Sequence, residues 1–521
     1  MATQDSDLER PAVLGAPFIA HHPMWRRMLY VAIGIFLSLA AATENALLSA
    51  NISSVAGEAG LTSAEASWLV IAFVSGSSFA NLVVIKGRQQ FGLHLMQRLM
   101  LGLDIASGLV CVVWPAYPAL LVNRALNGLM VSTCVASGIY YFIQALPKSY
   151  RLSAIVLGIC SVQMATPLAA MVPVDTLTAL GNAGFIRLAT AMSALCLLLV
   201  VAFPLPPTYT ARVINPLDGL SAGLLYATIL PLTAVLALGR TLWWTDTPWL
   251  GALLVMATLF GAAAIAMELC RTTPLLQVEW LSSWVVIQFV AVAVMERIVL
   301  GEQSTGVSGL FSQAGLINDQ LHTFYGFVLA GMVCGAIAVA FLITPKTIPV
   351  LCIAALFLIG VAAWIDTGSN ELSRPREFWF SQMLLGLGTT MFVAPALVYG
   401  ISLVLKSDPS HFISTILVFS AAQSLGSVIG SAVLGSLHYY YQQYTLLSLS
   451  QQLPATADTA ARLRALGRSA LSSMLQTQSN TLGYLNVFGF VRDLAIAVAL
   501  FMLGRILWRA WRETGQEKPT R

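Results

Sequence analysis

An acidic and a basic residue stand side by side in the otherwise apolar stretch VAVAVMERIVLGEQSTG at 291–307, as Glu296 and Arg297. A charge inside a membrane is costly, so such a residue is a candidate for ion or substrate chemistry. Three further charges lie in apolar stretches: Glu44 in LSLAAATENALLSA, Asp104 in LGLDIASG and Arg124 in PALLVNRALNGLMV.

A carboxyl group buried in this way can bind a proton on one side of a membrane and release it on the other. Burial favours the neutral form, and a nearby arginine favours the charged form. We expect Glu44 to be the proton carrier, Glu296 to be the second candidate, and Arg124 to pair with one of them. The alternatives are that Glu296 and Arg297 form a helix end reaching water, that Arg124 fixes packing, and that Asp104 is structural.

The elements that position these residues are long apolar helices. The 521 residues are 57% hydrophobic and 10% charged, whereas soluble chains carry about 25% charged residues. Stretches of membrane-spanning length predict an all-α polytopic membrane protein with fourteen helices, near 28–50, 66–85, 95–116, 118–142, 152–174, 184–204, 217–238, 248–269, 280–300, 322–344, 347–366, 377–404, 411–437 and 485–508.

The basic residues give these helices an orientation. With a cytoplasmic N-terminus, 17 of the 27 lysines and arginines lie on the cytoplasmic side and six on the outer side. The positive-inside rule therefore places both termini of this multi-pass protein in the cytoplasm. Glu44 and Glu296 then lie at matching depths, about 24 Å from the inner face of a core about 30 Å thick.

Several function classes lack their motifs. The seven cysteines form no CxxC pair, and the six histidines show no metal-ligand spacing. Glycine-rich phosphate loops are also missing. We therefore expect no enzyme activity, no metal, no cofactor and no nucleic-acid partner. The expected energy source is a proton gradient.

Five stretches of the sequence resemble motifs of the major facilitator superfamily, and within it of the fourteen-helix drug:proton antiporters of the EmrB/QacA type. They are ATENALLSANISSVAG (42–57), SWLVIAFVSGSSFA (67–80), NRALNGLMVS (123–132), QSLGSVIGSAVLGS (423–436) and QTQSNTLGYLNVF (476–488). The matching motif residues are Trp68, Arg124, Asn127, Gly128, Gly426 and Gly430, with Glu44 in place of the usual aspartate.

Two motifs depart from the family pattern. The loop VIKGRQQFGLHL (84–95) keeps Gly92 but has Ile85 at the first glycine and Arg88 near the aspartate position. The fifth-helix motif reads QMATPLAAMVPVD (163–175), with Pro167 kept and alanines at most glycine positions. The chain is similar to a divergent branch of the family.

The resemblance implies a division of the chain. A cytoplasmic tail (1–27) precedes a six-helix bundle (28–204), two inserted helices (217–269), a second six-helix bundle (280–508) and a short tail (509–521). The helix at 280–300 then corresponds to the helix at 28–50, and MERIVLGEQSTG forms the outer mouth of the transport path. Amide and aromatic groups facing the central cavity would contact substrate: Gln163, Phe289, Phe380 and Gln382.

The implied function is proton-coupled export of an amphipathic small molecule, such as a drug or toxic metabolite. The alternatives are export of an anionic metabolite or siderophore, and a nontransporting membrane component on a degenerate facilitator fold. The segment 438–484 is predicted to be a long outer loop with an amphipathic helix. Because relatives of this type work with a periplasmic adaptor and an outer-membrane channel, we expect this segment either to dock an adaptor or to fold over the protein's own outer face.

Overall fold

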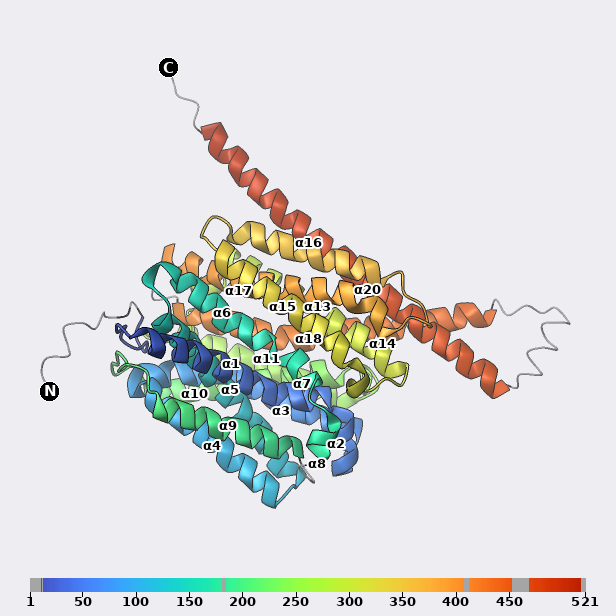
Figure 1. The fold of residues 1–521 in the computed structure, drawn as a ribbon, viewed down its shortest axis with the longest axis horizontal. Helices are drawn as coiled ribbons and strands as arrows, with labels where there is room; N and C mark the ends of the chain where they lie inside the picture. The colour runs from blue at the N-terminus through green and yellow to red at the C-terminus, as the bar shows by residue number, and fades with distance from the viewer. Residues whose placement is uncertain (1–10, 12, 180–183, 407–411, 452–467, 517–521) are drawn as a thin grey trace, which may run out of the picture.

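Long apolar helices form nearly the whole molecule (Figure 1). The computed structural model describes residues 11, 13–179, 184–406, 412–451 and 468–516. Within these ranges, 13 helices are long and apolar enough to cross a membrane. A fourteenth is counted if the bent pair Ile52–Ala59 and Ser63–Asn81 forms one span. The predicted all-α, multi-pass architecture is confirmed.

The first half of the chain contains six long helical segments. These are α1 (Met24–Ala50), α3 (Ser63–Phe91), α4 (Leu93–Val113), α5 (Tyr117–Ala145), α6 with α7 (Arg151–Gln163 and Ala165–Ala170) and α9 (Gly184–Ala202), with short α2 (Ile52–Ala59) and α8 (Val174–Ala179) between them. We call the side on which α1 begins the terminal side.

The expected N-terminal tail is partly integrated into the bundle. Its residues 13–22 run beside the segment after α9, with Gly15 N donating to Tyr209 O at 2.8 Å. Gln144 of α5 donates to Phe18 O at 2.6 Å and lies 3.2 Å from His22 Nε2. Burial and the neighbouring Arg26 lower the pKa of His22 below its ordinary value of 6.5, which favours the neutral ring.

Two helices follow the first half, α10 (Pro216–Leu238) and α11 (Pro248–Leu269). A charged clasp joins them to α3 on the terminal side: Lys86 binds Asp218 at 2.7 Å, and Arg271 binds both Asp218 and Glu268. Burial opposes the charge of Arg271, but the two carboxylates raise its pKa above the ordinary value.

The second half repeats the pattern of long helices. They are α13 (Trp284–Gly301), α15 (His322–Leu342), α16 (Ile348–Asp366), α17 (Trp379–Lys406), α18 (Phe412–Gln451) and α20 (Arg468–Gln516). Its short elements are α12 (Val278–Leu281), α14 (Ser308–Gln313) and the 3-10 turns η4 (Asn318–Leu321) and η5 (Pro375–Phe378), while another 3-10 turn, η2 (Lys148–Tyr150), lies between α5 and α6 in the first half. A π-helix, η3 (Glu302–Val307), continues α13 into α14, so the predicted helix end at 300 is wrong.

The predicted outer loop at 438–484 is also wrong. α18 continues to Gln451 and α20 starts at Arg468, so most of the segment lies in the two flanking helices. These helices project beyond the other helices as a hairpin, at the right of Figure 1. We call this end of the molecule the hairpin side. Part of the expected amphipathic stretch, 452–467, lies outside the described residues.

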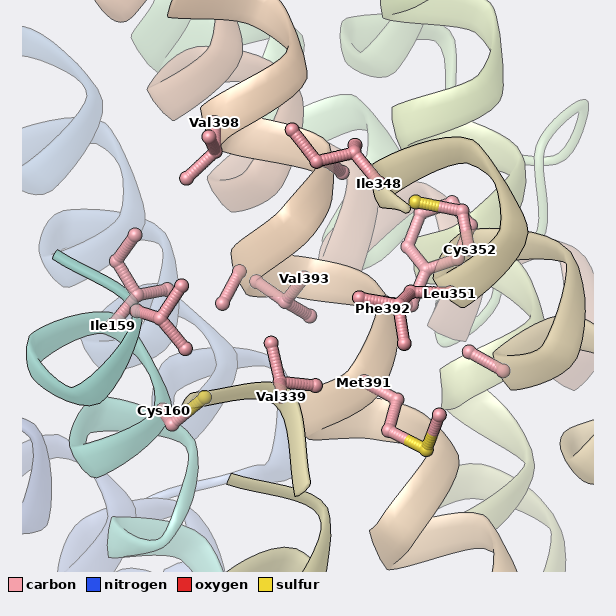
Figure 2. Close-up of a cluster of buried hydrophobic side chains, with 14 of the residues drawn as sticks. Ile159, Cys160, Val339, Ile348, Leu351, Cys352, Met391, Phe392, Val393 and Val398 are labelled. Atoms are coloured by element: carbon pink, nitrogen blue, oxygen red, sulfur yellow. The ribbon is translucent and has the colours of Figure 1, made fainter. Parts of the chain in front are cut away.

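The two halves pack together through a buried apolar cluster (Figure 2). Ile159 and Cys160 of α6 face Val339 of α15 and Val393 of α17 across the junction. Hydrogen bonds join the halves on both sides of this cluster. Ser153 Oγ donates to Ala340 O at 2.7 Å on the terminal side, and Asn318 Nδ2 donates to Ala50 O at 2.8 Å on the hairpin side.

Candidate functional site

Two carboxyl groups from different helices meet inside the first half. Glu44 of α1 and Asp104 of α4 are 2% and 3% exposed. Ser193 Oγ of α9 lies between them, at 2.7 Å from Asp104 Oδ2 and in hydrogen-bonding contact with Glu44. Asn127 Nδ2 of α5 also contacts both groups, with 3.4 Å to Asp104 Oδ1. The four side chains form one polar cluster in an apolar bundle.

A buried arginine stands beside this acidic pair. Arg124 lies one helical turn before Asn127 on α5 and is 3% exposed. Its Nη2 donates to Asn123 Oδ1 at 3.0 Å, while Nη1 is buried without a hydrogen-bond partner. In the part of the chain that the structure describes, Arg124 forms no ion pair with either carboxyl group. An arginine with a spare donor can pair with a carboxylate that loses its proton, or with an anionic ligand.

Close helix crossing brings these residues together. A Cβ at Gly128 would lie 2.5 Å from Phe73 O and 2.6 Å from Ser77 N of α3. Only a glycine therefore lets α5 approach α3 so closely. Gly128 thus sets the position of its neighbour Asn127, and the predicted motif residues Asn127 and Gly128 lie at the acidic pair.

Glu296 and Arg297 lie in a separate group on α13. Gln423 Nε2 of α18 donates to Glu296 Oε2 at 3.3 Å, and Arg297 Nε donates to Gln423 Oε1. Glu296 is fully buried and its Oε1 has no partner. Because the helix continues to Gln313, the interpretation of Glu296 as a helix end is wrong.

The motif glycines of α18 allow this contact. A Cβ at Gly426 would lie 3.1 Å from Arg297 Cβ, and one at Gly430 would lie 2.9 Å from Arg297 O. Beyond Arg297, Ser304 and Thr305 line a polar pocket of about 390 Å³ with Arg240 and Tyr484 on the hairpin side. The end of the GEQSTG stretch is thus at an opening.

A second acidic pair was missed by the sequence analysis. Glu302 of η3 and Asp366 of α16 are 0% and 1% exposed, and Gln382 Nε2 of α17 donates to both, at 3.3 Å and 2.8 Å. Glu302 was placed beyond a helix end and Asp366 at one, where exposure to water is expected. The acidic residue in GEQSTG was the available signal, but only a continuing helix buries it.

The predicted substrate residues do not form one group. Gln382 is engaged by the second acidic pair, whereas Phe380 is 60% exposed. Gln163 is half-buried at the end of α6. Phe289 lines a mostly apolar pocket of about 130 Å³ between α13, α16, α17 and α20, with Gln288 and Arg505 at its polar end.

The remaining motif residues pack against other helices or lie where helices join. Trp68 packs with α10 and α11 beside the buried Leu238 and Leu250. Gly92 forms the tight link between α3 and α4 at φ 83°, a conformation that favours glycine. Pro167 is buried in α7, next to the break from α6.

Several solved structures share this arrangement of helices. The proton:xylose symporter XylE matches with a TM-score of 0.54 and 12% identity, covering 90% of this chain and 97% of its own. The human organic anion transporter MFSD10 (TETRAN) matches at 0.52 and 15%, covering 91% and 100%. A bacterial homologue of the human drug peptide transporters PepT1 and PepT2 matches at 0.57 and 11%, covering 93% and 99%.

The sequence itself matches no family model, and no curated protein matches it. The matched structures are those of transporters. XylE is described within the major facilitator superfamily. The chain therefore has the major facilitator fold, shared over nine-tenths of its length with structures of sugar, organic anion and peptide transporters.

Proposed function

We propose that this protein is a proton-coupled exporter of amphipathic small molecules in the bacterial inner membrane, with its terminal side in the cytoplasm. The observation that carries the proposal is the buried Glu44–Asp104 pair beside Arg124, within a major facilitator fold. Two buried carboxyl groups that share the donors Ser193 and Asn127 repel each other when both are ionised, so the pair holds at least one proton.

Arg124 gives the pair a second state. With one proton on the pair, the remaining carboxylate and the guanidinium balance each other's charge. When the proton leaves, the second carboxylate charge acts on Arg124, whose Nη1 has no partner in the present state. We infer that Arg124 then turns toward the pair and shifts α5 relative to α1. Such a two-state element is what coupling of a proton to a conformational change requires.

The contacts between the halves are suited to alternating access. Release of the Ser153–Ala340 contact would open the terminal side, and release of the Asn318–Ala50 contact would open the hairpin side. Val174 N also donates to Asp319 Oδ1 at 3.1 Å on the hairpin side. Each such hydrogen bond contributes only about 0.5–1.5 kcal/mol, so the apolar cluster between the halves is the larger contact that must rearrange.

Two features of the structure bear on the class of substrate. The apolar pocket at Phe289 with Arg505 at its polar end fits an amphipathic molecule. The spare donor of the buried Arg124 favours a second candidate, an anionic metabolite or siderophore. A cationic dye such as ethidium and an anionic dye such as fluorescein separate these two classes.

We also propose that the protein works with a periplasmic adaptor and an outer-membrane channel. The hairpin of α18 and α20 projects from the bundle (Figure 1) and exposes Tyr440, Tyr444, Leu447 and Met474, each 58% exposed or more. Exposed aromatic and apolar side chains on a projecting helix pair favour a protein partner. Replacing 445–478 with a Gly/Ser linker should lower adaptor copurification and preserve transport in proteoliposomes.

The test of coupling uses proteoliposomes with an imposed pH gradient and the two dyes. The wild type should move one dye faster with the gradient than without it. Glu44→Gln should abolish this dependence, while the control Glu371→Gln, an exposed acid on the hairpin side, should not. Gradient-driven rates that are equal in wild type and Glu44→Gln would refute the assignment.

A further inference from the structure

The acidic pair of the second half lies on the helices that correspond, in chain order, to those carrying the pair of the first half. Glu44, Asp104 and Asn127 come from the first, third and fourth long helices of their half, α1, α4 and α5. Glu302, Asp366 and Gln382 come from the first, third and fourth long helices of theirs, α13 with η3, α16 and α17. Each half therefore places a Glu, an Asp and a bridging carboxamide on corresponding helices of a repeated fold.

The geometry of the second pair favours a bound proton. Glu302 Oε1 and Asp366 Oδ2 both accept from the same donor atom, Gln382 Nε2, at 3.3 Å and 2.8 Å, so the two carboxyl groups face one nitrogen. Two carboxylates at one site repel each other, and a proton on one of them removes that repulsion. Both residues are at least 99% buried, so two adjacent carboxylate charges would be unscreened by water.

The surroundings supply no compensating charge. From α17, the neutral side chain of Gln382 donates to Asp366. From α20 the facing residues are apolar, including Val487 and Val491, and Arg492 binds its neighbour Asp493 at 2.8 Å on an exposed face. In the described part of the chain, no lysine, arginine or histidine forms an ion pair with Glu302 or Asp366. This separates the second pair from the first, which faces Arg124.

Two buried acceptors of this group have no partner. Glu302 Oε2 and Gln382 Oε1 have no hydrogen-bond partner, and both residues are 0% exposed. Unsatisfied buried acceptors favour a bound donor, and a proton on the pair is the smallest one that fits. The π-helix supports this reading, because such segments occur often at functional sites. Its residues Ser304 and Thr305 also line the polar pocket on the hairpin side, which gives protons a polar approach.

We propose that Glu302 and Asp366 form a second proton-binding site in which the two carboxyl groups share one proton and Gln382 holds them together. The site would let the protein carry a proton in each half. This inference extends the proposed proton coupling, but proton occupancy can be measured without transport, so the two can fail separately.

The experiment is infrared spectroscopy of the purified full chain near pH 7, quantifying the carbonyl stretch of protonated carboxyl groups. The double variant Glu302→Gln/Asp366→Asn should lose the absorbance of one carboxylic acid per protein. Each single variant should keep it, because the remaining acid still has no cation beside it and must stay neutral. Glu371→Gln should change nothing, and Glu44→Gln/Asp104→Asn should remove the separate contribution of the first pair.

A folded double variant, verified by size-exclusion chromatography, that keeps the full wild-type absorbance would overturn the proposal. So would a wild-type band that is present in choline chloride and disappears in sodium chloride, because the pair would then hold a metal cation. A further variant covers poor folding of the double variant. Gln382→Met removes the bridging donor and should shift the band of the second pair, and an unchanged band would also contradict the site.

Discussion

Replacing Gly128 with alanine should destabilise the protein by overpacking the crossing of α3 and α5. The added Cβ would meet Phe73 O at 2.5 Å and Ser77 N at 2.6 Å, whereas ordinary contacts begin near 3.4 Å. The obstacle is backbone, which no side-chain rotation can remove, so the helices must separate by about 1 Å. We expect a loss of about 1–3 kcal/mol in the free energy of unfolding.

The assay is equilibrium unfolding in mixed detergent micelles, with Gly102→Ala as the matched control. Gly102 lies within α4 of the same half, and a Cβ there would meet nothing within 4 Å. That variant should be neutral or more stable by up to about 1 kcal/mol, since alanine is the better helix former. Equal stabilities of the two variants would refute the packing argument, and with it the role of Gly128 in positioning Asn127.

Three other predictions concern the site and the contacts around it. Ser193→Ala removes a fully buried donor shared by Glu44 and Asp104, and should cost about 1–3 kcal/mol in the same unfolding assay; an unchanged stability would show that Ser193 does not hold the pair. Cysteine pairs at Ser153 with Ala340, and at Asn318 with Ala50, should each stop dye transport when cross-linked and restore it on reduction, whereas continued transport by a fully cross-linked pair would show that its contact does not open. The folded state lowers the pKa of His22, so the stability this neutral ring contributes is present above the unfolded value near 6.5 and is lost as pH falls below it. The protection factors of 13–22 in hydrogen exchange, which are corrected for the pH dependence of the intrinsic rate, should accordingly fall from about pH 7.5 to about pH 5.5, and His22→Phe, unlike a variant of the exposed His21, should remove that fall.

The helices and the two acids of the first pair could be predicted individually from the sequence for a simple reason. Apolar stretches of membrane-spanning length leave few alternatives to a helix, and a charge within one, such as Glu44 or Asp104, is conspicuous. That Glu44 and Asp104 meet could not be predicted, because they lie on different helices, α1 and α4, and only the folded bundle brings those helices together.

The ends of helices were the less predictable part. The polar residues of GEQSTG and HYYYQQY suggest exit from the membrane, yet the structure continues through both as helix. In η3 the continuation is a π-helix that turns Glu302 toward Asp366. A polar side chain loses free energy of hydration when it is buried. A hydrogen-bond partner on another helix offsets that loss, but such a partner cannot be identified from a single stretch of sequence.

Proton release on substrate binding tests the proposed coupling most directly. The purified wild-type protein in a weakly buffered detergent solution, mixed with whichever dye it transports, should release protons that a pH indicator detects. The variant Glu44→Gln/Asp104→Asn should bind the dye and release fewer protons than the wild type, because neither residue of the first pair can then ionise. Proton release of the same size from that double variant would contradict a coupling role for the Glu44–Asp104 pair.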